Sequence, residues 1–454
     1  MKKSLSVPIA IGVAGMFFAY SATAQTVLDQ YIKKGLEGNL ALQQKTFDRQ
    51  KAELDLKRAK ALFYPQASLN SQYTLATGGR TQDIPIGDLL NNVYATLNQL
   101  TGQNKFPQVE NQSIAFLPND FHDTRLEVVV PIVNRDLHYN KAIKQEMIHN
   151  QQADIDIYKR ELVKNIKEAY YQYLQAGKAV DIYTNALALA SENLRVSDKL
   201  MQNAMATKES VLRAKAQVSQ VKASLIAANN QQLNAAAYFN CLLNQSLDAP
   251  ILADTTLFER LNTTINAPLE LPAQREELMK LQSAQKVLGT SLKMNRNYLV
   301  PKLNAFYNIG FQGFGFHFNN DQFYQLGGLQ FKWDLFKSND NKYKIRQSEL
   351  DLEQLNTQYK DVAQQLTLQV FTSAANYRSA IQTLAARTDE VQSATETYRF
   401  AERRFREGQA LQLELIDART QLTNAQLNYS LAQLAVLARA AELERATASY
   451  DFSF

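Results

Sequence analysis

Cysteine is almost absent from the sequence, which contains one, Cys241, in 454 residues. One cysteine cannot form a disulfide within the chain, and no histidine stands near it to complete a metal site. We interpret Cys241 as a small buried residue on the helical pattern at 235–243. Glycine and proline are also scarce, with 16 and 10 residues, and this scarcity favours long helices.

The residue patterns of enzymes and nucleic-acid binders are missing as well. The four histidines stand apart from one another, without metal-ligand spacing, and no Gly-x-Ser-x-Gly or phosphate loop occurs. The net charge of +5 is too small for this length to indicate nucleic acid. Residues 313–318 superficially resemble an RNA-binding motif, but we interpret them as a glycine-aromatic turn at a strand end. We therefore expect no enzymatic activity, no cofactor, no metal and no nucleic-acid partner.

Long apolar runs are confined to the N-terminus. Lys2 and Lys3 precede an apolar run over 7–20, and Ala22-Thr23-Ala24 has the pattern of a cleavage site. Residues 1–24 are therefore predicted to be a secretory signal peptide. No later stretch has about 20 uninterrupted apolar residues, so no transmembrane helix is expected after processing.

The chain is organised around two very long helical hairpins. In the second, apolar or small residues recur in steps of 4 and 3 before and after a break at Gly408, which predicts an antiparallel coiled coil with its tip there. The pattern also occurs 204 positions earlier, around a tip at Ala204, with Ser197 among its seam residues. A register kept over so many heptads indicates an internal duplication. The helix expected from about 339 to 407 would be on the order of 100 Å long.

Four segments alternate apolar and polar residues with period two and predict β-strands. They lie around 66–75, 125–133, 303–312 and 329–335. A loop over about 77–123, with a short helix near 88–100, is expected between the first two. We expect a first repeat over 25–245, built as a helix over 27–62, a strand, a loop, a second strand and a long hairpin. A linker over 246–271 and a second repeat over 272–454 follow.

Strands with one apolar and one polar, largely uncharged face suit either a half-buried sheet or a membrane barrel. Four strands cannot close a barrel, and an open sheet edge cannot lie in lipid, so several copies must share one barrel. Two copies give eight strands, whose interior side chains fill, whereas three give twelve and leave room for a pore. The fold class expected is thus mainly α with a small β membrane part: a trimeric twelve-stranded barrel continued by a coiled-coil helical tunnel. Aromatic residues near strand ends would form its interfacial girdle: Tyr64, Tyr73, Tyr307, Phe323, Tyr324 and Trp333.

These features resemble the TolC-like outer-membrane efflux protein family over nearly the whole mature chain. The resemblance rests on the duplicated halves, the Tyr-Pro entry to a strand at Tyr64, and above all the second tip. There Phe405-x-x-Gly408 is followed by Glu414-Leu415-Ile416-Asp417-Ala418, similar to the family's aromatic-x-x-Gly and acidic-hydrophobic-hydrophobic-Asp-Ala.

The resemblance implies an outer-membrane channel with its helical tunnel in the periplasm, in a tripartite efflux or type I secretion system. Such a channel passively conducts substrate delivered by an inner-membrane transporter, of RND or ABC type, through a periplasmic adaptor protein. The alternative is a periplasmic coiled-coil scaffold without a pore.

The resemblance also implies two groups of site residues. By matching position, Glu414 and Asp417 would narrow the periplasmic entrance as acidic rings, although exposed carboxylates on a helix more often only face solvent. The gate group is Glu414, Asp417, Phe405, Glu209 and Ser210. The adaptor-docking tips are Ala204, Met205, Ala206, Gly408, Gln409 and Ala410. Ala204, Ser210 and Ala410 depart from residues common in the family, so its tip-locking network cannot be transferred to this chain.

Overall fold

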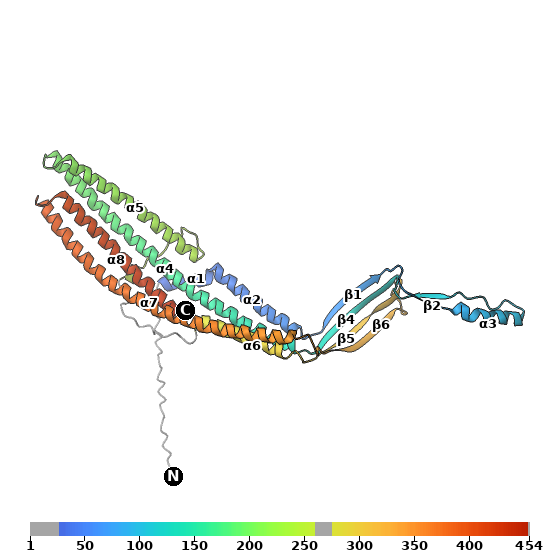
Figure 1. Cartoon of the computed structure of the whole chain (residues 1–454). Helices are drawn as coiled ribbons and strands as arrows, with labels where there is room; N and C mark the ends of the chain where they lie inside the picture. The colour runs from blue at the N-terminus through green and yellow to red at the C-terminus, as the bar shows by residue number, and fades with distance from the viewer. Residues whose placement is uncertain (1–26, 259–274, 453–454) are drawn as a thin grey trace, which may run out of the picture. The chain divides into compact units, whose positions relative to one another are not determined.

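The computed structural model describes residues 27–258 and 275–452 (Figure 1). The predicted signal peptide and half of the predicted linker, residues 259–271, lie outside these residues. The chain divides into two compact units, one of 27–43, 158–258 and 366–452, the other of 44–157 and 275–365. The helices are α1 (Val27–Gly38), α2 (Leu40–Ala61), α3 (Ile86–Thr101), α4 (Arg135–Gln202), α5 (Lys208–Leu242), α6 (Glu276–Arg296), α7 (Asp340–Arg406) and α8 (Gln412–Thr447), with a 3-10 turn at Thr255–Phe258. The strands are β1 (Gln66–Thr74), β2 (Thr81–Ile84), β3 (Gln112–Ala115), β4 (Phe121–Val133), β5 (Lys302–Phe314) and β6 (Phe323–Lys332).

The four predicted strands form one antiparallel sheet in the order β1-β4-β5-β6. The register pairs Leu69 with Leu126 and Leu126 with Ile309, so the apolar sets of these strands lie on the same face. The other face carries Asn70, whose amide donates to Glu127 at 3.0 Å, and an Arg125–Asp123 ion pair. The strand prediction and its two-faced pattern are therefore confirmed.

The last strand lies earlier in the sequence than expected. β6 ends at Lys332, whereas the alternation predicted a strand through Leu335. The reason is that β5 begins at Lys302, directly opposite Lys332, so residues beyond that pair have no neighbouring strand. Trp333 instead donates its indole N–H to the Leu299 carbonyl at 2.9 Å.

The segment between β1 and β4 is more ordered than the predicted loop. It contains the expected helix, α3, which ends at Gly102 with a left-handed φ of 65°. It also contains a two-stranded β2–β3 ribbon that was not predicted, because four-residue strands give too short an alternation to recognise. Figure 1 shows this insertion, which we define as residues 75–120, extending from one end of the sheet.

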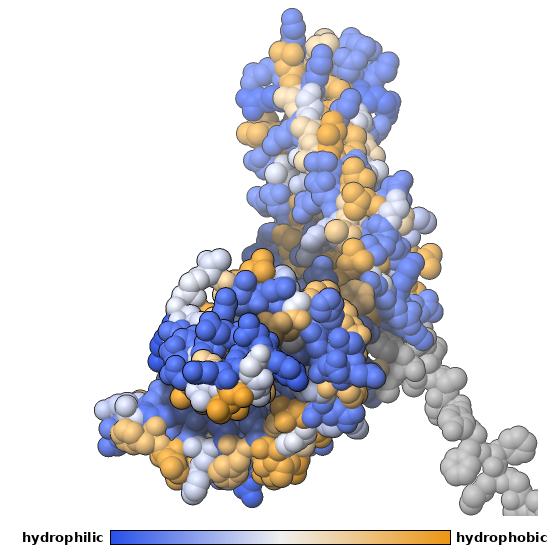
Figure 2. Space-filling model, turned by 90° about the vertical axis from the view of Figure 1, so that its right-hand side faces the viewer, coloured by the Kyte–Doolittle hydropathy of each residue, from blue (hydrophilic) through white to orange (hydrophobic). Residues whose placement is uncertain are grey.

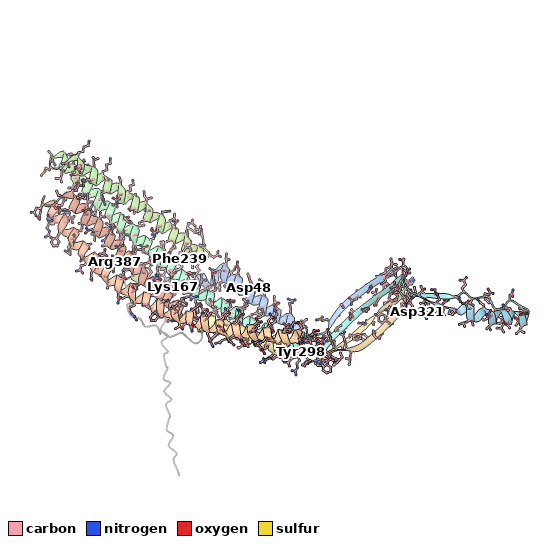
Figure 3. The ribbon with its side chains drawn as sticks, in the orientation of Figure 1. Asp48, Lys167, Phe239, Tyr298, Asp321 and Arg387 are labelled. Atoms are coloured by element: carbon pink, nitrogen blue, oxygen red, sulfur yellow. The ribbon has the colours of Figure 1, made fainter. Side chains whose placement is uncertain are left out.

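The predicted coiled-coil seams are confirmed in the unit that holds the hairpins. Between α7 and α8, the buried seam residues Tyr377, Ala380 and Leu384 pack with Ala432 and Val436. In α4, the seam residues Leu162, Ile166 and Ala169 are at most 2% exposed. Figure 1 shows the α4–α5 and α7–α8 hairpins side by side. Lys167, labelled in Figure 3, joins them through a 2.7 Å ion pair to Glu444 on α8.

Two expectations for helices were wrong. The first predicted helix, 27–62, is broken at Asn39, whose Oδ1 accepts bonds from Leu42 N–H (3.0 Å) and the Tyr158 hydroxyl (3.1 Å) and so ends α1 and caps α2. Cys241 is exposed rather than buried. It follows two fully buried residues on α5, Phe239 (Figure 3) and Asn240, and the rotation of about 100° per residue turns it to the surface.

Candidate functional site

The two hairpin tips have the same backbone conformation. Ala204 and Gly408 both adopt left-handed φ angles, 58° and 71°. The next amide in each tip, of Met205 or Gln409, donates over 2.8 Å to the carbonyl five residues earlier. This pattern is the Schellman motif of helix C-termini, and every paired position is 204 residues apart. The duplication inferred from the sequence thus extends to individual hydrogen bonds of the tips.

The helices that leave the tips begin with different caps. At the start of α5, the Thr207 hydroxyl accepts from Ser210 N–H at 3.3 Å. At the start of α8, Leu411 has no side-chain acceptor, and the Glu414 carboxylate reaches back to Leu411 N–H at 3.4 Å. At the second tip, the Glu414 side chain therefore accepts a hydrogen bond from a backbone amide at the start of α8. At the first tip, the backbone amide of Ser210 is instead the donor, and the Thr207 side chain accepts it.

Arg404 spans the second tip. Its guanidinium donates to the Gln409 carbonyl at 3.1 Å and pairs with Glu414 at 3.4 Å. Both charged side chains are about half exposed, so water screens the pair. In the first tip, 204 positions earlier, the equivalent residues are Leu200 and Ser210. Among the described residues, this clasp therefore occurs at the second tip and has no equivalent at the first.

The other predicted gate residues have different surroundings. Asp417, one turn beyond Glu414, is exposed and makes no hydrogen bond or ion pair with any described residue. Glu209 is exposed and paired with Arg213 at 2.6 Å. Phe405 packs against a buried cluster of Tyr398, Leu415 and Ala418, so it anchors the tip rather than facing open solvent. No hydrogen bond or ion pair joins Glu209 or Ser210 to Glu414 or Asp417 within the described part of the chain.

Sequence reasoning missed two polar residues beside this site. Arg419 is only 7% exposed, lies over the Tyr398 ring at 5.7 Å and donates to the Tyr398 hydroxyl at 3.3 Å. A seam pattern read from apolar residues alone gives no reason to place an arginine in the interior. Gln412 donates to Ser197 of α4 at 2.8 Å and so links the second tip to the first hairpin. Ser197 was predicted as a seam residue, but the seam does not specify its partner.

The predicted aromatic girdle divides into three groups. Tyr64 and Trp333, 67% and 52% exposed, lie next to the strand ends nearest the helices. The register places Tyr73, Tyr307 and Phe323 on the apolar face of the sheet. Tyr324 lies on the polar face, where its hydroxyl donates to Asp123 at 3.1 Å. Tyr324 is thus separated from the others by the strand alternation.

The described residues hold no group of three or more histidine, cysteine, aspartate or glutamate side chains that could bind a metal ion. Among the helices in the described ranges, none is both long and apolar enough to span a bilayer. The tips consist of small, polar and charged side chains together with the exposed, apolar Met205, all at helix ends. Such an arrangement can bind other helices or ions, and it has no nucleophile held beside a base.

Comparisons with known proteins point to one family. Residues 268–449 match the family of outer membrane efflux proteins. No curated protein sequence matches the chain. Among solved structures, the Campylobacter jejuni CmeC outer membrane channel is 12% identical with a TM-score of 0.72, and 98% of this chain and 94% of CmeC are covered.

Two further structures have the same fold at similar identity. The outer membrane protein VceC from Vibrio cholerae is 15% identical with a TM-score of 0.70, over 92% of this chain and 95% of VceC. The open state of the Neisseria gonorrhoeae MtrE outer membrane channel is 15% identical with a TM-score of 0.70, over 92% of this chain and 88% of MtrE. The matched family is one of efflux proteins rather than a class of enzymes. The second half of the chain thus matches the outer membrane efflux protein family, and the chain as a whole has the fold of these outer-membrane channels.

Proposed function

We propose that three copies of this chain form the outer-membrane channel of a tripartite efflux or type I secretion system. The observation that carries this proposal is the four-stranded sheet, whose apolar side chains share one face. Apolar residues on that face are open to the surroundings, with Leu69 73% and Leu329 67% exposed. Figure 2 shows apolar residues, in orange, reaching the surface among polar ones on the face it draws.

The two outer strands supply the reason for sharing a barrel. β1 and β6 each have a strand on one side only among the described residues. In lipid, the unpaired N–H and C=O groups of such an edge would each cost several kcal/mol. Pairing β1 of one copy with β6 of the next removes every edge, and three copies give twelve strands with a water-filled interior. The polar face with Asp123, Arg125 and Glu127 would then line the lumen.

We assign the helical hairpins to the periplasm, with their tips at the entrance. Substrate enters there from an inner-membrane transporter, of RND or ABC type, through a periplasmic adaptor. The tip segments 204–206 and 408–410 have small or flexible side chains and lie at the ends of exposed helices, which suits close contact with helices of the adaptor. In a trimer, Asp417 and Glu414 would form acidic rings that favour cations. Five of the aromatic residues, all but Tyr324, would lie at the lipid boundary.

A substitution at a tip tests the docking role. Ala206→Arg places a long charged side chain at the first tip, and Ala227→Arg places the same group on an exposed position of α5 away from the tip. We expect Ala206→Arg to reduce export at least several-fold while the oligomer stays intact, and Ala227→Arg to export normally. Normal export by both variants would exclude the tips as the docking surface.

The scaffold alternative is tested by extraction. A periplasmic coiled coil without a barrel would leave the membrane in carbonate or high salt. The proposed channel stays in the membrane fraction and needs detergent, from which it elutes as a trimer.

A further inference from the structure

The helix α3 of the insertion has an exposed apolar stripe. Leu89, Val93, Thr96 and Leu100 follow one another in steps of 4, 3 and 4, the spacing of a helix-packing seam. Leu89, Val93 and Leu100 are 69%, 51% and 78% exposed. Thr96 donates its hydroxyl to the Asn92 carbonyl at 2.9 Å, which leaves its methyl group free for apolar packing.

The opposite side of α3 is already packed against the segment that follows it. Tyr94 contacts the Phe106 ring at 5.7 Å. The Asn98 side chain exchanges two hydrogen bonds with the Phe106 backbone (2.7 and 3.0 Å), and Asn91 exchanges two with Val109 (3.0 and 2.8 Å). The insertion is therefore fixed by its own polar contacts, and the exposed stripe is not needed to fold it.

The charge pattern of α3 is unusual for a helix surrounded by water. Asp88, in the first turn, is its only charged residue, and none follows through Thr101. A solvent-facing helix normally carries charges on its outer side. An uncharged helix with a 4-3-4 stripe instead suits packing against another helix without charge pairs at the flanks.

The position of the insertion indicates which helix covers the stripe. It connects β1 to β4, and β1 is an outer strand of the sheet. This inference rests on the proposed trimer, in which β1 pairs with β6 of the next copy. In that trimer, cyclic symmetry brings three insertions to the same rim in the same direction. We propose that the three α3 helices pack against one another in parallel through the stripe of Leu89, Val93, Thr96 and Leu100, so that the occupant of this face is a second copy of the chain.

Disulfide trapping in the full-length protein tests this packing. Cys241, the only cysteine and an exposed one, is first changed to serine. Val93→Cys then places a thiol on the stripe. Ala95→Cys, the matched control, places it about 200° around the same helix. Because a disulfide needs Cα atoms within about 7 Å, we expect mild oxidation to give roughly tenfold more cross-linked dimer for Val93→Cys than for Ala95→Cys.

The outcomes separate this inference from the proposed function. If the Cys241→Ser parent is a trimer in detergent but Val93→Cys cross-links no better than Ala95→Cys, the helix packing is wrong and the channel stands. If the parent is monomeric, the trimer itself is wrong. Cross-linking of Val93→Cys should not change on dilution, and a yield that falls with dilution would mean contact between separate assemblies and would overturn the packing.

Discussion

The two tips have different residues at the same left-handed backbone position, and this difference makes a paired prediction possible. Both tips hold one residue in the left-handed region, but the first uses Ala204 and the second Gly408. A left-handed conformation costs an L-residue roughly 1–2 kcal/mol, and replacement by glycine relieves this strain. The greater freedom of glycine in the unfolded chain offsets about 0.4–1 kcal/mol of that gain in stability. We therefore expect Ala204→Gly to stabilise the first tip by about 0.5–1 kcal/mol.

The reverse change at the second tip should have the opposite sign. A Cβ atom on Gly408 would meet no other atom within 4 Å, so Gly408→Ala adds backbone strain without a clash. It should destabilise the second tip by about 1 kcal/mol. Each substitution should leave the other tip unchanged because the two Schellman motifs share no hydrogen bond.

Amide hydrogen exchange of the tip peptides measures these effects. The Met205 and Gln409 amides donate the bonds that close the tips, and about 1 kcal/mol corresponds to a change of roughly fivefold in the exchange rate. Exchange should become slower at Met205 in Ala204→Gly and faster at Gln409 in Gly408→Ala. Ala206→Gly is the control, since Ala206 has no left-handed φ to relieve. Faster exchange at Met205 in Ala204→Gly, as expected for the control, would refute the strain argument.

Three further predictions concern charge. Replacing both Glu414 and Asp417 by alanine should weaken the cation selectivity of the reconstituted pore, and unchanged reversal potentials would exclude the acidic rings. Arg404→Gln frees Glu414 from its partner, so cation selectivity should rise, whereas Arg399→Gln, which breaks a similar exposed pair with Glu396 away from the tip, should not change it. Burial, with repulsion from Glu442 and Glu161, raises the pKa of Glu168. The ionised carboxyl therefore destabilises the fold at pH values above its unfolded pKa. Glu168→Gln should then raise the thermal unfolding midpoint more at pH 8 than at pH 4. An equal increase at both pH values would contradict the direction of this pKa shift.

Features with a repeating period were predictable from the sequence, and isolated contacts were not. The seams of α4 and α7, the tips at Ala204 and Gly408, and the strand faces each rest on many residues that agree. The break at Asn39 combines a local cap on the Leu42 N–H with a bond to Tyr158, over a hundred residues away, and no local pattern encodes the second contact. The exposure of Cys241 was missed because it depends on which side of α5 its neighbours bury.

The candidate site was predictable only in part, for the same reason. Sequence placed Glu414 and Asp417 one turn apart, but it could not show that Arg404 holds the first and leaves the second without a partner among the described residues. It also assigned Tyr324 to the girdle, since an aromatic residue near a strand end looks the same on either face until the register is known. Arg419 remained hidden because a buried cation, here without a carboxylate partner among the residues that the structure describes, contradicts the usual hydrophobic pattern of a seam.

The central claim is that several copies of a four-stranded sheet close one water-filled pore in lipid. The most direct measurement is the conductance of the purified protein in a planar bilayer, combined with its oligomeric state in the same detergent. We expect a trimer that gives discrete, long-lived conductance steps. A monodisperse monomer that is soluble without detergent and gives no conductance would contradict the account.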